Sequence, residues 1–323
     1  MNNSPASLLP LPDIAVVQAT GSEAIAFLHG QLTQDIQGLP GGQARLAGYC
    51  TPKGRLLGSL VIWKAPVAAQ GEDDPVAYAL VKSDIAAALT KRIAMFILRA
   101  KAKLQVTRLR VSGLTVAPTA QQPAGLPAQP NAWSVAQSEG ATYICAPTAG
   151  NSAVRWWVIT QEHNGAPGEA AEPAAGMHAQ WQAADIAAGL PWIQAATQDL
   201  FIPQTLNFDL IGGVNFTKGC YPGQEVVARA HYRGTVKRRM AYGVANDASG
   251  ADPSALPGVD TFDARQPDSP AGRIINAARA DDTLHLLMEV QLSDLDDAQY
   301  RLGAADGPAI QLVTLPYSIT AEG

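Results

Sequence analysis

The pattern of hydrophobic and polar positions predicts many short elements and no long repeat. In the first third of the chain, apolar runs and alternating positions predict strands at 14–18, 45–50, 56–63, 76–81 and 101–111. Helical spacing predicts helices at 22–32 and 83–92, which Ser22 and Ser83 would cap. A turn at 51–54 joins two of the strands, so hairpins are mixed with helices. This mixture predicts an α+β region rather than repeated βαβ units.

The middle of the chain continues the mixed pattern. Strands are predicted at 141–145 and 154–160, and a helix at 177–188, which Gly189 ends. Between them, 165–176 is rich in Ala, Gly, Pro and Glu, and this composition predicts a mobile loop.

From about residue 236 the pattern changes to strands separated by turn-rich segments. The strand-like runs fall at 240–245, 272–277, 284–292 and 310–315. No long helix is predicted among them, and this combination indicates an antiparallel barrel or sandwich. We therefore predict three domains: α+β lobes at 1–115 and 116–235, and a C-terminal antiparallel β-barrel at 236–323.

One eight-residue segment, 218–225 (Lys-Gly-Cys-Tyr-Pro-Gly-Gln-Glu), precedes a run of good helix formers; we call it the Cys220 motif. Pro222 suits the first helical position, which would place Cys220 near free backbone N–H groups and the positive end of a helix dipole. These groups and Lys218, two residues upstream, favour the thiolate. Glu225 suits the first turn or binds a ligand. The alternative is that Cys220 packs as a small buried hydrophobe.

Composition narrows the class of protein. With 47% hydrophobic and 16% charged residues in 323 positions, the chain has the composition of a soluble globular protein. Its three widely spaced cysteines fit neither a disulfide framework nor a paired zinc motif, so we predict a reducing compartment and no metal site. No signal peptide and no apolar span long enough for a membrane is recognised, which predicts a cytoplasmic protein that is not embedded in a membrane.

A net charge of −5 argues against a surface that coats nucleic acid along its whole length. Between Lys218 and Arg239, however, six Lys and Arg residues accompany a single acid, Glu225. Such a local patch attracts a phosphate, a polycarboxylate tail or an RNA backbone. The alternative is a solvated helix end whose cations lie near the negative pole of the dipole.

The Cys220 motif, followed by Arg229 and Arg233, resembles the signature of the YgfZ family of folate-binding, iron–sulfur-cluster and tRNA-modification accessory proteins. Other landmarks have the same order and spacing: 27–35, 50–55, the Trp181 helix ending at 189–191, 201–204 and 315–317. The resemblance spans nearly the whole chain.

The resemblance implies the fold of the glycine-cleavage T-protein, an aminomethyltransferase, with two lobes and a barrel around a central channel that binds tetrahydrofolate. The implied folate-binding residues are Trp181, Tyr221, Gly223, Gln224, Glu225, Arg229 and Arg233. By itself, Trp181 on a helix face is either a core residue or a ring that stacks on a flat ligand. Some members carry an aromatic residue on the first strand, where this chain has Ile14.

A second departure separates this chain from the T-proteins. They place a carboxylate in the strand after the 51–54 turn, where this chain has Ser59, a poor general base for aminomethyl transfer. The leading hypothesis is therefore a folate-binding accessory protein for iron–sulfur enzymes such as a tRNA methylthiolation enzyme, with Cys220 and Lys218 as its reactive pair. On this hypothesis the basic residues at 229–239 contact a folate tail, RNA or a partner protein. A single cysteine cannot hold an iron–sulfur cluster alone.

Two alternatives remain at this stage. One is a folate-dependent one-carbon (aminomethyl) transferase, whose substrate would be a folate adduct. The other is a binding module in which Cys220 merely packs.

Overall fold

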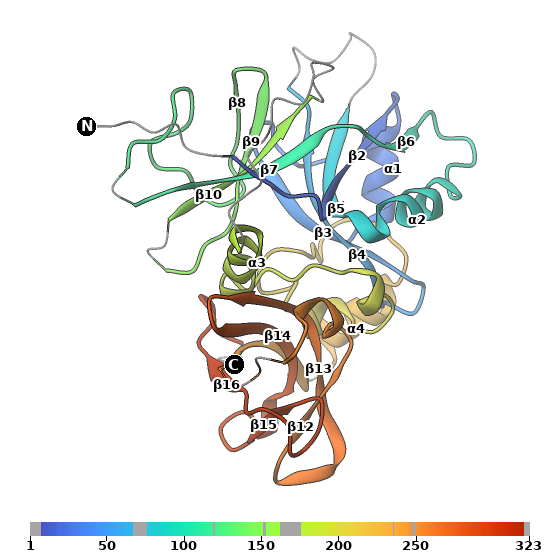
Figure 1. Cartoon of the computed structure of the whole chain (residues 1–323). Helices are drawn as coiled ribbons and strands as arrows, with labels where there is room; N and C mark the ends of the chain where they lie inside the picture. The colour runs from blue at the N-terminus through green and yellow to red at the C-terminus, as the bar shows by residue number, and fades with distance from the viewer. Residues whose placement is uncertain are drawn as a thin grey trace.

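Three β-sheets organise the chain, as the computed structural model shows (Figure 1). The structure describes residues 8–66, 76–118, 120–150, 153–161, 176–234, 236–246, 248 and 250–319. Of the stretch predicted as a mobile loop, residues 165–175 lie outside this described part. No helix in the described part of the chain is both long and apolar enough to cross a membrane.

The first sheet has the strand order β3-β4-β5-β2-β6, and its neighbours are antiparallel. Its strands are β2 (Ile14–Thr20), β3 (Ala44–Cys50), β4 (Leu56–Lys64), β5 (Ala77–Lys82) and β6 (Lys103–Val106). Two helices accompany it, α1 (Ala24–Gln31) and α2 (Ser83–Ala94). Except for β6, these strands and helices follow the predicted pattern within a few residues. Lys82 and Glu23, rather than the predicted serines, precede the two helices.

The second sheet has the order β1-β7-β10-β9-β8. Its strands are β1 (Leu9–Pro10), β7 (Arg110–Val116), β8 (Val135–Ser138), β9 (Ala141–Cys145) and β10 (Val154–Thr160). The single strand predicted at 101–111 is wrong, because β6 and β7 belong to different sheets. The chain turns between them where the Thr107 hydroxyl donates to the Val16 carbonyl at 3.0 Å and accepts from the Leu109 N–H at 3.2 Å.

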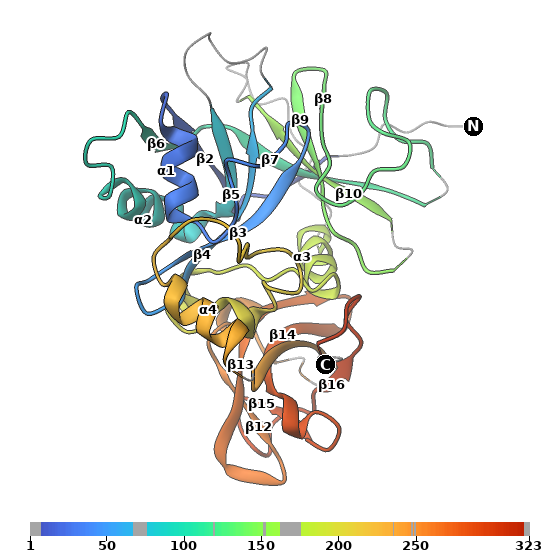
Figure 2. The same ribbon diagram turned by 180° about the vertical axis from the view of Figure 1, so that it is seen from behind.

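Between the two upper sheets and the third sheet lie α3 (Met177–Ala187) and α4 (Gln224–Tyr232) (Figure 2). The chain between these helices contains only short 3₁₀ turns, at Ala195–Thr197 and Pro203–Leu206. As predicted, Gly189 ends the α3 region, and it has a left-handed φ of +65°. The Tyr317 hydroxyl, near the end of the described chain, donates to the Gly189 carbonyl at 2.9 Å.

The third sheet has the order β15-β12-β13-β14-β11-β16. Its strands are β11 (Arg238–Ala245), β12 (Asp260–Asp263), β13 (Gln266–Ala280), β14 (Thr283–Gln291), β15 (Tyr300–Leu302) and β16 (Gln311–Val313). The predicted closed barrel is wrong, because this curved sheet is a half-barrel with β15 and β16 at its edges. These edge strands are only three residues long, and an isolated bridge, Arg301 to Ala309, links β15 to the chain just before β16.

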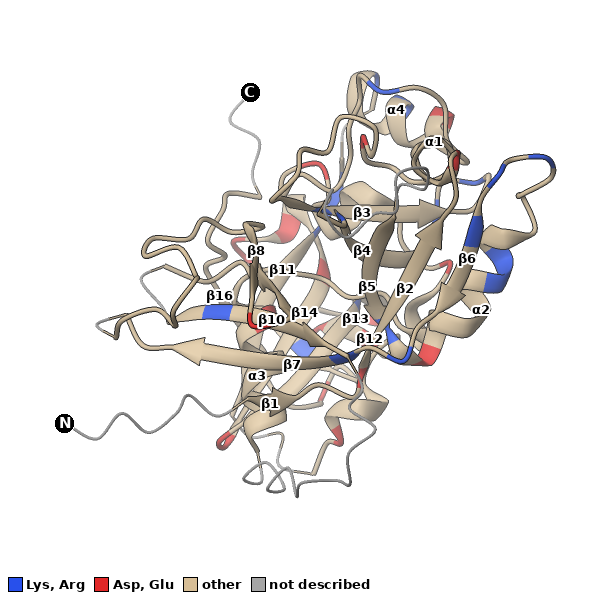
Figure 3. Ribbon diagram, turned by 90° about the horizontal axis from the view of Figure 1, so that it is seen from above, with Lys and Arg blue, Asp and Glu red and all other residues tan. Residues whose placement is uncertain are grey.

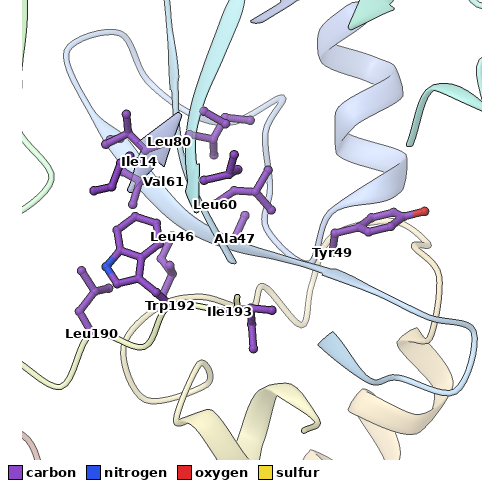
Figure 4. Close-up of a cluster of buried hydrophobic side chains, with 14 of the residues drawn as sticks. Ile14, Leu46, Ala47, Tyr49, Leu60, Val61, Leu80, Leu190, Trp192 and Ile193 are labelled. Carbon is purple, nitrogen blue, oxygen red and sulfur yellow. The ribbon is translucent and has the colours of Figure 1, made fainter. Parts of the chain in front are cut away.

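One continuous hydrophobic core joins the first two sheets to the chain that follows α3. Leu190, Trp192 and Ile193 come from that chain and lie among side chains of the first sheet, such as Ile14 and Leu60 (Figure 4). The Ile193 N–H donates to the buried Ser59 hydroxyl at 2.8 Å. Ser59, which we expected to stand in place of a T-protein carboxylate, therefore has a structural hydrogen bond in this chain.

Candidate functional site

Cys220 is the one cysteine that solvent reaches, since Cys50 and Cys145 are both buried. Burial raises the pKa of the Cys50 thiol to about 12 and that of Cys145 to about 11. These two thiols are therefore protonated and inert at neutral pH. Cys220 lies in the loop before α4, and among the described residues no hydrogen bond ends on its sulfur.

The start of α4 differs from the prediction. The helix begins at Gln224 with Gly223 as its N-cap, so Pro222 is not the first helical residue. Gly223 has a left-handed φ of +82°, a conformation that turns the chain just before the helix. Cys220 consequently lies two residues further along the chain from the first residue of α4 than the sequence indicated.

Gly223 and Gly54 touch backbone to backbone. A Cβ atom at Gly223 would lie 2.4 Å from the Thr51 carbonyl oxygen and 2.7 Å from the Gly54 Cα. A Cβ atom at Gly54, whose φ is +73°, would lie 2.9 Å from the Val226 side chain. Only glycine fits at both positions, and this contact holds the Cys220 motif against the turn that follows β3.

Lys218 fixes the other end of the motif. Its ammonium group donates to the carbonyl oxygens of His29 and Leu32, the latter at 2.9 Å, at the carboxyl end of α1. It also lies 4.8 Å from the centre of the Tyr221 ring. Burial lowers the pKa of Lys218 to about 8, although the charges of Asp35 and Cys220 oppose this shift. Lys218 therefore acts as a cationic cap for α1 and as the charge nearest to Cys220 in sequence.

His29 and Asp35 lie beside the Cys220 motif, and neither residue was predicted from the sequence to have a role. His29 Nδ1 lies 3.1 Å from Asp35 Oδ1, and His29 Nε2 would lie 3.8 Å from a Cβ atom on Gly219. Burial and the Lys218 charge lower the pKa of His29 despite Asp35. A hydrogen bond from the Gly38 N–H lowers the pKa of Asp35. The sequence could have indicated both residues, because they lie in segment 27–35, one of the landmarks of the family resemblance.

The remaining residues of the motif and helix lie on different surfaces. Tyr221 is buried, and burial raises the pKa of its phenol. Gln224 is half-buried, whereas Glu225, Arg229 and Arg233 are exposed on α4. No ion pair within the described part of the chain involves the last three.

The cations between Lys218 and Arg239 fall into two groups, those that form ion pairs and those that are exposed without one. Arg239 is buried and pairs with Asp209 at 2.6 Å, and Arg238 pairs with Glu289 at 3.1 Å. Exposed cations therefore remain at Arg229, Arg233 and Lys237.

Aromatic rings accompany these exposed cations. His231 stacks on Phe216 with ring centres 3.7 Å apart, and Tyr232 beside it is 65% exposed. Stacking rings between cations are typical of surfaces that bind RNA.

Trp181 lies on α3, away from the Cys220 motif, and is buried. Its ring packs against Gly113 of β7, where a Cβ atom would lie 2.5 Å from it, and under the Arg155 guanidinium at 4.8 Å. A pocket of about 510 Å³ beside it is bounded by α3, β7 and β10; we call it the Trp181 pocket. In the described structure no contact joins Trp181 to the Cys220 motif.

A second cavity, of about 330 Å³, lies on the opposite side of α3, between the first and third sheets; we call it the junction cavity. Its polar lining includes Lys82, Gln182, Asp185, Asn276 and Arg279, with Trp192 as its aromatic wall. No local pattern in the sequence predicts this cavity, because β5, α3 and β13 meet only in the fold.

Hydrogen bonds hold the polar lining of the junction cavity in place. Asp185 accepts from Arg155 at 2.7 Å and from the Trp192 indole N–H at 3.0 Å. Lys82 pairs with Asp13 at 2.5 Å, and His178 lies 2.7 Å from the same carboxylate. Burial raises the pKa of Asp13, but His178 and Lys82 outweigh it and hold the pKa far below its usual value.

Gly223→Ala is expected to lower the free energy of unfolding by at least about 2 kcal/mol, because the new methyl group meets backbone atoms as well as a left-handed φ. Gly212→Ala is the matched control: its φ is +74°, but nothing lies within 4 Å of the added Cβ. The control is expected to cost only about 1 kcal/mol. Equal losses in urea unfolding would contradict the backbone contact.

The lowered pKa of Lys218 predicts a pH dependence of stability. Between pH 8 and 10.5 the folded protein has lost this proton while the unfolded chain still holds it. The free energy of unfolding of the wild type, measured relative to Lys218→Met, is therefore expected to rise over this range. A flat difference between pH 7 and 10 would show that Lys218 titrates normally.

Comparison with known proteins gives full-length relatives. The chain is 32% identical to the tRNA-modifying protein YgfZ of Serratia proteamaculans, over 98% of this chain and 94% of the relative. It is 32% identical to the Cronobacter sakazakii protein of that name, with the same coverage, and 30% identical to the Vibrio atlanticus protein over 96% and 92%. No protein-family model matches the chain.

Among solved structures, the fold is similar to that of the glycine cleavage system aminomethyltransferase T from Bartonella henselae. The TM-score is 0.64 at 14% identity, over 96% of this chain and 85% of that chain. This likeness confirms the predicted T-protein-like mixed α/β fold. The sequence identity to these relatives over almost the whole length shows that the chain belongs to the YgfZ family.

Proposed function

We propose that the protein is a folate-binding accessory protein that supports tRNA modification, with Cys220 as its reactive group. The observation that carries this proposal is the placement of Cys220, the one exposed thiol, on a loop held by Lys218 and by the Gly54–Gly223 contact. The relatives at about 30% identity are named tRNA-modifying proteins, which supports the tRNA-related role.

Tetrahydrofolate would bind in the junction cavity. Asp185 and Asn276 provide fixed polar groups, Trp192 provides an aromatic wall, and Arg279 provides a cation. The cavity is of the size and polarity expected for a small-molecule site between structural units. Trp181 would act from the other side of α3, because Arg155 packs on its ring and binds Asp185. When bound, the folate would supply one-carbon chemistry.

The remaining motif residues would have supporting roles in this scheme. Lys218 would stabilise charge on Cys220, and Tyr221, Gly223 and Gln224 would fix the loop and the start of α4. Arg229 and Arg233, with Lys237, would bind the phosphates of a tRNA, and the exposed Tyr232 would stack on a base. The enzymes that this protein would support are iron–sulfur enzymes such as a tRNA methylthiolation enzyme.

The structure around Ser59 favours an accessory role over aminomethyl transfer. Its buried hydroxyl accepts from the Ile193 N–H, so the position supplies no carboxylate for a cationic intermediate. One-carbon transfer on a folate adduct is the alternative activity. It requires turnover of methylene- or formyl-folate by the purified protein, which the accessory role does not.

Cys220→Ser is expected to abolish restoration of tRNA methylthiolation in cells that lack the protein, because a serine hydroxyl cannot replace the sulfur as a nucleophile. Cys145→Ser is the matched control and is expected to restore full modification. Mass spectrometry of the modified nucleoside in bulk tRNA provides the measurement. Full restoration by Cys220→Ser would reduce Cys220 to a packing residue.

Replacing one alanine of each cavity by leucine tests which of the two cavities binds folate. Ala277→Leu would fill the junction cavity, whereas Ala184→Leu would fill the Trp181 pocket. By isothermal titration calorimetry, Ala277→Leu is expected to weaken tetrahydrofolate binding at least about tenfold, and Ala184→Leu to leave it unchanged. The opposite result would place folate beside Trp181, and tight binding by both variants would exclude both cavities.

A further inference from the structure

A second basic surface lies far from the Cys220 motif in the sequence. Residues 91–110 contain seven Lys and Arg residues and no acid, in a chain whose net charge is −5. They extend over the end of α2, the following loop, β6 and the start of β7. Figure 3 shows this concentration of blue along α2, its loop and β6.

All seven cations are exposed: Lys91, Arg92, Arg99, Lys101, Lys103, Arg108 and Arg110. The first six form no ion pair with a described residue, and Arg92 donates to the Tyr49 phenol. Two nearby acids are already engaged with backbone groups: Glu23 accepts from the Lys101 N–H at 2.7 Å, and Asp84 accepts from the Ala195 N–H at 2.8 Å. Six of the seven cations are therefore not paired with an acid in the described part of the chain.

Large apolar side chains stand among these cations. Met95 is 61% exposed, Phe96 50% and Leu98 88%, and Leu98 is the most exposed large hydrophobic residue in the described part of the chain. Apolar anchors of this kind inside a charged rim are characteristic of a protein interface. Phosphate groups would leave Leu98 and Met95 in water, so an RNA backbone does not account for them.

The edge of the first sheet passes beside the same residues. β6 is an edge strand that pairs with β2 on one side, and none of the described strands pairs with its other side. Backbone N–H and C=O groups on such an edge can accept another strand. Lys103 on this edge would oppose self-association through its charge. That role does not explain why Met95 and Phe96 are exposed next to it. Neither RNA nor lipid offers peptide groups to pair with this edge.

We propose that this α2–β6 surface docks an acidic, partly apolar segment of a partner protein. The segment would add as a strand to β6, its acidic side chains would face the cations, and its apolar side chains would pack on Met95, Phe96 and Leu98. This surface belongs to the first sheet and is independent of the Cys220 chemistry.

A fluorescein-labelled peptide of alternating Glu and Val tests the proposal by anisotropy with the full-length protein, and a peptide of alternating Lys and Val is its charge control. The Glu-Val peptide is expected to bind, more weakly at high salt, and the Lys-Val peptide is not. Leu98→Ser with Phe96→Ser, and separately Lys103→Glu, are expected to weaken binding about tenfold.

Leu210→Ser is the matched control, because Leu210 is an exposed apolar residue outside this surface, and it should leave binding unchanged. Unchanged thermal unfolding of the variants shows that they are folded. The proposal is overturned if the Glu-Val peptide does not bind, or if its binding ignores the variants. It is also overturned if unmodified tRNA or phosphatidylglycerol vesicles bind through the same residues, because that would identify a nucleic-acid or membrane surface.

Discussion

The backbone contact between Gly54 and Gly223 sets where the cysteine loop can lie. Each glycine has a left-handed φ and leaves no room for a Cβ atom, so the turn after β3 and the start of α4 approach closely. Lys218 then fixes the beginning of the loop by capping the carbonyl groups at the end of α1. Cys220 lies between these two attachments and remains exposed. A thiol on a loop with two fixed ends has a defined position without being buried.

The cations of the chain differ in whether they have partners within the fold or are exposed. Within the basic run near the motif, Lys218 is half-buried and Arg239 is buried, and both side chains are held by partners within the fold. Arg229 and Arg233 stay exposed beside aromatic rings and can meet an anion. The α2–β6 surface concentrates cations on the first sheet. An acidic chain therefore presents two separate basic surfaces, one suited to phosphate and the other to an acidic polypeptide.

Local sequence patterns predicted most of the strands, because the alternation of apolar and polar positions is a local property. They missed the start of α4, since the conformation of Gly223 comes from packing against Gly54, far away in the chain. They also missed the partners of Lys218, the nearest of which lies 186 residues away. The junction cavity was equally invisible, because it forms where β5, α3 and β13 meet. The apolar runs also did not reveal that β15 and β16 form ladders only with β12 and β11, so that the third sheet stays open as a half-barrel.

Cys220 is a solvent-accessible thiol on a loop with two fixed ends, whereas the other two thiols are buried in the core. Timed alkylation of the native protein with iodoacetamide, read by peptide mass spectrometry, measures this difference. Cys220 is expected to be modified long before Cys50 and Cys145, which should react only after denaturation. Protection of Cys220 in the native protein, or modification of all three cysteines at one rate, would contradict it.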